Sequence, residues 1–182
     1  MSQITQEERI YLIDYLKDTQ SKLSHICKNT SSEQAIFKPS EEVWSIADNV
    51  EHLSLVEKSL RKAVDFSLTQ TPTEEEIAAH TSSNDYVQKK ISTRGLAVKA
   101  PERVLPTRAT NIEISLITFI ERREDNINFV TTTDGDLHKH YWAHPFLGLL
   151  SSYQAFIMLA AHLERHLAQI EEIKADENFP KY

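Results

Sequence analysis

The sequence predicts an all-α fold, a four-helix bundle with a long crossover between its second and third helices. Four segments of about 22–26 residues carry apolar side chains at steps of three, four or seven, which is the period of a helix with one buried face. The chain contains only 3 glycines among 182 residues and lacks the Asn-Gly pairs of tight β-hairpins. Helices of this length and number are typical of a four-helix bundle.

The first two helices are expected over residues 5–29 and 45–69. Each begins with a capping box, in which a Ser or Thr is followed three residues later by an acid or Gln, here at Thr5 and Ser45. The apolar stripe of the first helix contains Ile13, Leu16, Leu23 and Cys27. The stripe of the second helix contains Ile46, Val50, Leu53, Leu60, Val64 and Leu68.

A long polar link, residues 71–109, follows the second helix and contains three prolines. A capping box at Thr73 opens only a short stretch of helical period, so one or two short helices and a crossover are expected here. Because the link is long, the second and third helices need not be simple antiparallel neighbours.

The third helix is expected over residues 111–132, after a capping box at Thr110, and the fourth over 151–175, after one at Ser151. Residues 134–150 are interpreted as an irregular connector, although their aromatic and histidine content is high for that role. Since domains commonly contain about 100–200 residues, we expect residues 1–182 to form a single domain.

Composition excludes several classes of function. The net charge of −7 and the absence of a Lys/Arg-rich run disfavour nucleic acid as a partner. The single cysteine, Cys27, excludes an internal disulfide and a multi-cysteine zinc site. The sequence has neither an apolar signal region nor an apolar stretch of roughly 18 residues, so a cytoplasmic protein that does not enter a membrane is expected.

Histidines supply the candidate metal site. His162 and His166 are four residues apart and therefore lie on one face of the fourth helix, where two imidazoles can bind one ion. The zinc-protease signature is absent, because Leu163 follows His162. His52, the only histidine of the second helix, is the candidate third ligand. Three imidazoles with open positions are typical of a catalytic metal, but the histidines could also be incidental on a plain helical interaction protein.

Three motifs together resemble those of the DinB superfamily, specifically its DinB-like-domain branch. They are WSIADNVEHL, HPFLG and HLERHLAQI, and the resemblance spans residues 39–174. It implies a four-helix bundle of up-down-down-up type. It also implies a divalent metal ion held by His52, His162 and His166. The family includes members that resemble low-molecular-weight-thiol S-transferases, a thiol-dependent isomerase and many hydrolases.

The predicted function is therefore a divalent-metal-dependent enzyme whose three-histidine site activates a small thiol or water, of S-transferase or hydrolase type. The alternative is a non-catalytic metal-binding bundle with a stress-response or dimerisation role. Zinc and nickel are the favoured ions, and iron and copper also suit three imidazoles. The expected partners are a small-molecule substrate, which could be a low-molecular-weight thiol, and a second copy of the chain in a homodimer.

Other polar residues near these motifs each have two possible roles. Asp48 could cap its helix or hydrogen-bond His52, and Gln169 could orient a ligand or simply pack. His144 could line the pocket or hold a loop, with the loop role favoured. The roles of His138 and His140 stay open between a metal-binding pair and a solvated loop.

Overall fold

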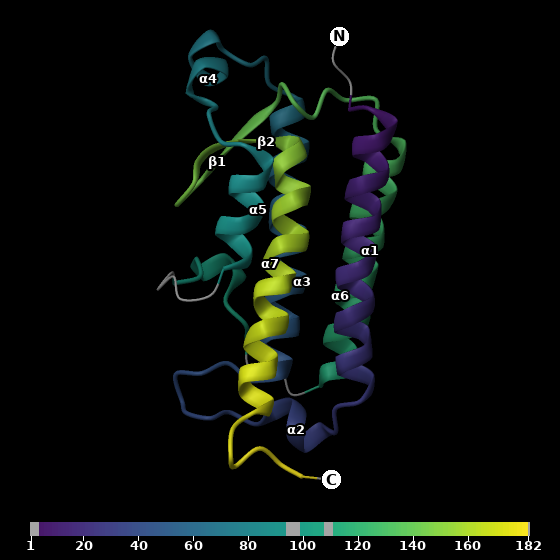
Figure 1. Cartoon of the computed structure of the whole chain (residues 1–182), viewed down its shortest axis with the longest axis vertical. Helices are drawn as coiled ribbons and strands as arrows, with labels where there is room; N and C mark the ends of the chain where they lie inside the picture. The colour runs from purple at the N-terminus through teal and green to yellow at the C-terminus, as the bar shows by residue number, and fades with distance from the viewer. Residues whose placement is uncertain (1–3, 94–98, 108–110, 182) are drawn as a thin grey trace.

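The four-helix bundle is confirmed by the computed structural model, which describes residues 4–93, 99–107 and 111–181. The long helices of this part of the chain are α1 (Gln6–Lys28), α3 (Ile46–Leu68), α6 (Ile112–Thr132) and α7 (Ser152–Lys174) (Figure 1). The capping boxes predicted at Thr5, Ser45 and Ser151 are all formed. Local sequence signals therefore locate these three helix starts to within one residue.

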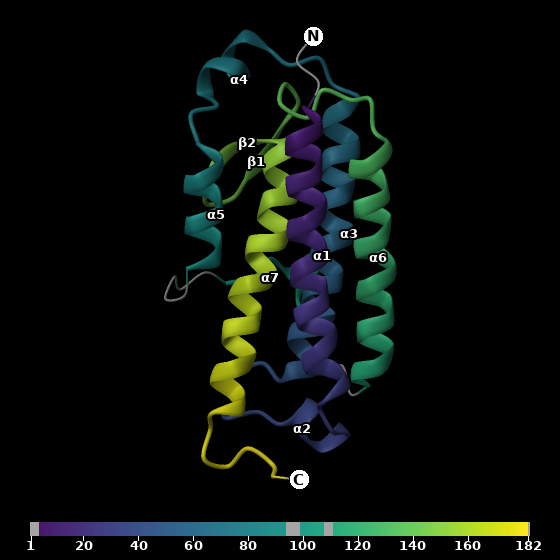
Figure 2. The ribbon, with the colours of Figure 1, turned by 45° about the vertical axis from the view of Figure 1, so that its right-hand side comes forward.

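The long helices pack in a square in which α1 and α3 each contact both α6 and α7. Arg9 near the start of α1 donates to the Val130 carbonyl near the end of α6, so these two helices are antiparallel. Ser67 near the end of α3 hydrogen-bonds Ser152 at the start of α7 at 2.8 Å, so this pair is antiparallel too. Figures 1 and 2 show that α1 and α7 run in one direction and α3 and α6 in the other, which is an up-down-down-up order.

The core fills the space between the long helices in two clusters of buried apolar side chains, one centred on residues such as Phe156 and Val64 and the other on residues such as Phe119 and Leu163. Most members of the predicted stripes are buried, including Leu16, Leu23, Val50, Leu60, Val130 and Ile170. No helix of the described residues has the length and apolar character needed to cross a membrane.

The link between α3 and α6 contains the expected short helices, α4 (Glu74–Ala79), α5 (Asn84–Ser92) and the 3-10 turn η1 (Glu102–Val104). α5 packs along α7 on the outside of the bundle (Figure 1). The short helix α2 (Ser32–Ile36), between α1 and α3, was not among the expected elements, although Ser31 and Gln34 form a capping box at its start.

The connector before α7 is a β-hairpin, and the prediction of an irregular segment there is wrong. Strand β1 (Tyr141–His144) pairs antiparallel with β2 (Gly148–Ser151). Gly148 takes a φ of +73°, a left-handed conformation that glycine adopts without strain and that closes the turn. Strands of four residues are too short to show a clear alternation of apolar and polar side chains, and the turn between them does not use an Asn-Gly pair.

The start of α6 also differs from expectation. Asn111 is the N-cap, and its side-chain oxygen accepts a hydrogen bond from the Ile114 N–H at 3.1 Å. Thr110, the predicted cap, lies outside the described residues. Asn ranks above Thr as an N-cap residue, so N-cap propensity was the signal for Asn111 that the capping-box pattern at Thr110 concealed.

Candidate metal centre

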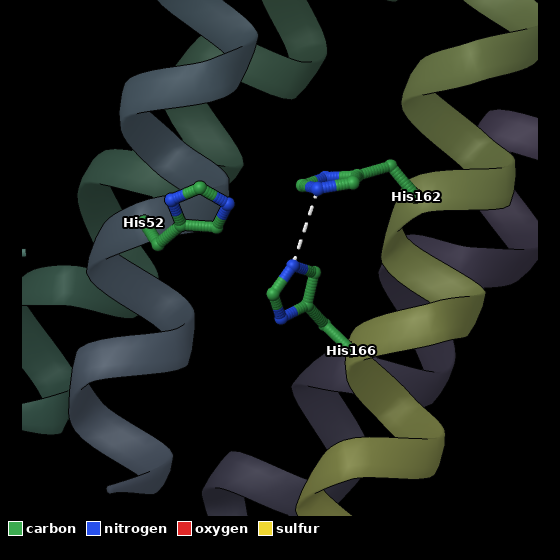
Figure 3. A group of neighbouring side chains, drawn as sticks. All are labelled: His52, His162 and His166. Atoms are coloured by element: carbon green, nitrogen blue, oxygen red, sulfur yellow. Dashed lines mark hydrogen bonds between the residues drawn. The ribbon is translucent and has the colours of Figure 1, made fainter. Parts of the chain in front are cut away.

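The structure brings His52, His162 and His166 together between α3 and α7 (Figure 3). Their candidate ligand nitrogens all lie within 4.8 Å of one another, and the Nε2 atoms of His162 and His166 are 3.2 Å apart. His162 and His166 are on successive turns of α7, and the antiparallel packing of α3 places His52 opposite them. His52 and His166 are buried, and His162 is partly buried.

Two of the three rings are held by oxygen atoms behind them. His52 Nδ1 lies 2.7 Å from the main-chain oxygen of Val104, and His166 Nδ1 lies 2.6 Å from the Oδ1 atom of Asn49. The amide nitrogen of Asn49 donates to the Ser45 carbonyl at 2.8 Å, which fixes which end of the amide faces His166. A ring that donates from Nδ1 carries its lone pair on Nε2, and this is the arrangement of a metal-ligating histidine.

The third ring, His162, is different because its buried Nδ1 has no hydrogen-bond partner among the described residues. Its Nε2 points to Nε2 of His166 (Figure 3). Two lone pairs at that distance repel unless a proton or a cation lies between them. Nitrogens about 2.1 Å from one ion are about 3.4 Å apart at a tetrahedral angle, so the observed 3.2 Å fits a shared divalent ion.

Burial favours the neutral form of His52 and His162. It lowers the pKa of His52, and the hydrogen bond to the Val104 carbonyl opposes this only in part. The pKa of His162 lies well below its usual value, first because the ring is desolvated and then because His52 and Arg165 are close. A neutral imidazole has a lone pair for an ion, so both rings are in the ligating form at pH 7.

Trp44 packs against the cluster from the side. Its ring centroid is 4.7 Å from that of His52 and 6.2 Å from that of His166, to which it is nearly parallel at 11°. Asp48 caps α3 and also forms an ion pair: its Oδ2 accepts from the Ser45 N–H at 3.0 Å and lies 2.6 Å from Lys38 Nζ. The suggested hydrogen bond from Asp48 to His52 is therefore wrong, and Asn49 and Val104 are the groups that orient the histidines.

A cavity of about 1170 Å³ opens in front of the histidines. The three histidines, Gln169 and both tryptophans line it, together with apolar side chains such as Met158 and Leu147. Its walls come from α3, α5, η1, the hairpin, the loop before α3 and α7. The segments expected to be mere connectors thus build most of the binding space.

The remaining candidate histidines divide between the cavity and the far end of the bundle. His144 lines the cavity, its Nδ1 accepts from the backbone N–H groups of Phe146 and Leu147, and burial lowers its pKa to about 4. His138 instead pairs with Glu8 at 3.1 Å, and His140 Nδ1 lies 2.9 Å from the Ser67 carbonyl oxygen. Neither His138 nor His140 is among the residues that line the cavity.

Two groups that orient the ligands were missed from the sequence. Asn49 lies three residues before His52 on the same face of α3, and this spacing was a usable signal. Val104 contributes a main-chain oxygen, which no side-chain pattern can reveal.

Comparison with known proteins agrees with this architecture. A family model described as the DinB superfamily matches residues 15–170. The fold resembles that of YfiT from Bacillus subtilis, described as a probable metal-dependent hydrolase with an unusual four-helix bundle topology. The TM-score is 0.62 at 18% sequence identity, and the alignment covers 96% of this chain and 90% of that one. No curated protein matches the sequence.

Proposed function

This chain belongs to the DinB superfamily, and from that premise we propose that it is a divalent-metal-dependent enzyme whose ion is held by His52, His162 and His166. The observation that carries the proposal is the convergence of three imidazoles, two of them oriented by oxygen acceptors, on the wall of a large cavity. The donor set suits zinc or nickel best, and iron or copper also fits.

In this proposal the three histidines hold the ion, and other residues of the chain orient the histidine rings. The Val104 carbonyl and Asn49 amide keep two rings in the ligating tautomer, and Trp44 restricts their rotation. A divalent ion with three imidazole ligands supplies Lewis-acid chemistry, because it lowers the pKa of a water or thiol bound at its open position. The apolar and aromatic walls fit a small-molecule substrate.

The placement of the carboxylates near the site argues against a protease-like mechanism with a carboxylate base. It favours direct activation of a small thiol or water by the ion. No carboxylate joins the histidine cluster within the described part of the chain. Glu164, two residues from His162, accepts a hydrogen bond from Tyr15 at 2.6 Å and is engaged there. A thiol needs less help than water to lose its proton, so thiol S-transfer and the hydrolysis of a small substrate are the two activities we propose to test.

The competing proposal is a metal-binding bundle without catalysis. The cavity of about 1170 Å³ supports the enzyme, since a purely structural ion is enclosed by four protein ligands and needs no space for a substrate.

Metal content tests the site directly. Protein purified after expression with zinc or nickel is expected to hold about one ion per chain. His52→Ala, His162→Ala and His166→Ala should each lose the ion while their circular dichroism stays helical. The matched control is His25→Ala, because His25 is exposed on α1 and outside the cluster. A wild-type protein without bound metal would contradict the proposal.

Turnover separates the enzyme from the structural alternative. The metal-loaded protein is assayed with small thiols and an electrophile, and separately with activated esters and amides. We expect one of the two activities, lost in His162→Ala and kept in His25→Ala. A stoichiometric ion with no turnover across both panels would favour the non-catalytic bundle.

The homodimer and the cytoplasmic location stay predictions. Ile114 and Ile117 are exposed one turn apart on α6, which supports an apolar contact between two copies. A light-scattering mass equal to one chain would contradict the dimer.

A further inference from the structure

His144 differs from the clustered histidines in which nitrogen carries the proton. Its Nδ1 accepts hydrogen bonds from the backbone N–H groups of Phe146 at 3.2 Å and Leu147 at 3.1 Å. A neutral imidazole that accepts at Nδ1 must carry its proton on Nε2. His52 and His166 have the opposite tautomer, because their Nδ1 atoms face oxygens.

This assignment excludes His144 as a fourth ligand, since its Nε2 has no free lone pair. It leaves an N–H group on a ring that lines the same cavity as the three histidines. Within the described residues, no hydrogen bond of this Nε2 accompanies the two at Nδ1. His144 is therefore a neutral donor beside the metal centre.

The hairpin holds this donor in place. The ring packs edge-on against Trp142 at 5.5 Å and against Phe146 at 6.0 Å between centroids. The two backbone donors belong to the turn that Gly148 closes with its positive φ. The ring therefore keeps one orientation before any ligand arrives.

The same strand supplies a second donor. Trp142 and His144 are two residues apart on β1, so their side chains share one face of the hairpin, and both line the cavity. The indole Nε1 of Trp142 is buried and has no acceptor among the described residues. A buried N–H without an acceptor is unfavourable, and a ligand oxygen that reached it would relieve that cost.

Charges in the cavity wall indicate which kind of oxygen fits. Basic side chains enter the wall from the crossover, at Lys90 on α5 and Arg103 on η1. The acidic side chains of the wall are Glu42 in the loop before α3, Glu172 near the end of α7 and Asp176 just beyond that end, whereas the hairpin leads into the start of α7 (Figure 1). Two N–H donors with cations nearby suit a carboxylate.

We propose that β1 forms a donor subsite, made of His144 Nε2–H and Trp142 Nε1–H, that binds a carboxylate of the substrate beside the three-histidine centre. The subsite rests on the proposed function, because it places the substrate relative to a bound ion. His144 and Trp142 are positioning residues here, and the substrate class narrows to small carboxylic acids and their derivatives.

Acetate is the probe for this subsite. Co²⁺-loaded protein is titrated with acetate, and binding is followed by the visible bands of the ion and by tryptophan fluorescence. His144→Asn keeps an oxygen that can accept from the turn but removes the distant N–H, and Trp142→Phe keeps a ring but removes the indole donor. Each loss of a neutral donor is expected to weaken acetate binding by roughly 3- to 10-fold with Co²⁺ stoichiometry unchanged.

The control is His25→Ala, which should bind acetate as the wild type does. Acetate affinities within twofold of the wild type in both variants, with Co²⁺ bound, would overturn the subsite and leave the metal centre intact. Failure of the wild type to bind Co²⁺ would overturn the metal centre, and the subsite with it. Failure of the Co²⁺-loaded wild type to bind acetate would overturn the subsite alone.

Discussion

Two buried polar centres lie in this bundle, and they differ in what their principal groups face. Each has one buried atom without a hydrogen-bond partner among the described residues, Asn126 Oδ1 in the first and His162 Nδ1 in the second. In the first, Arg123 of α6 donates from Nε and Nη2 to Oε1 of Glu57 at 2.9 and 2.5 Å, and from Nη1 to the Leu16 carbonyl at 3.0 Å. Asn126 donates to the other oxygen of Glu57 at 2.6 Å. In the second, the three histidines meet at a cavity with one Nδ1 lacking any described partner.

The difference separates a structural role from a ligand-binding role. The Arg123 side chain is 0% exposed, and its partners belong to α1, α3 and α7 as well as the cation–π contact with Phe119. A charge so enclosed ties the helices together, and the protein itself supplies the partners of the guanidinium. The histidine centre uses hydrogen bonds to the protein to orient the rings of His52 and His166, and its candidate ligand nitrogens lie within 4.8 Å of one another, which supports the ligand-binding role proposed above.

The largest expected effect tests the first centre. Arg123→Met leaves the Glu57 carboxylate buried without its cation, which should lower the free energy of unfolding by about 3–5 kcal/mol in urea denaturation of the metal-free protein. The neighbouring Arg122→Met is the control, because Arg122 is only partly buried and donates to the Ser54 hydroxyl. A smaller loss of unfolding free energy in Arg123→Met than in Arg122→Met would show that the Arg123–Glu57 ion pair does not hold the helices together.

Metal addition tests the second centre. An ion present at 100 times its dissociation constant should raise the free energy of unfolding by about 2.7 kcal/mol, and EDTA should reverse this. His162→Ala should abolish the gain and leave the metal-free stability nearly unchanged, since the ring has an unsatisfied buried nitrogen. Thermal denaturation with and without zinc measures both, and an undiminished gain in His162→Ala would remove this histidine from the site.

Asn49 has a structural role within the ligand-binding centre. It accepts a hydrogen bond from His166 Nδ1 and is not itself a proposed ligand of the ion. Asn49→Ala removes the acceptor of His166 Nδ1 and should weaken metal affinity by about 10- to 100-fold in chelator competition. Asn49→Asp keeps an oxygen acceptor and should retain most of the affinity. Equal affinities in all three proteins would mean that the orientation of His166 comes from packing with Trp44 alone.

The smallest effect is the pH dependence of the metal-free protein. Burial lowers the pKa of His52, His144 and His162 in the folded state, so the unfolded chain binds more protons below pH 6.5. Stability should therefore fall as the pH drops from 7 to 6, by about 0.7 kcal/mol for His144, whose pKa is lowered to about 4, and in the same direction for His52 and His162. His144→Asn should reduce this slope in urea denaturation at a series of pH values, and an unchanged slope would contradict the lowered pKa of His144.

The sequence revealed one of these centres and hid the other. The histidine pair stands out because imidazoles four residues apart share one helix face. His52 was the candidate third ligand as the only histidine of the second helix, and the family resemblance implied the same three residues. Arg123 and Glu57 look like ordinary surface charges of two helices, because no pattern shows that a charge faces its partner. The hairpin escaped detection since two strands of four residues give too little alternation to recognise.

By itself, the sequence determined the long helices, most of their starts and the shared face of His162 and His166. These features follow from interactions within about four residues, through helical periodicity and capping. Only the tertiary structure decided which nitrogen each histidine presents, which carbonyl and amide hold the rings, and which connectors wall the cavity. These contacts join groups as far apart in sequence as Asn49 and His166, so they exist only when the whole bundle has packed.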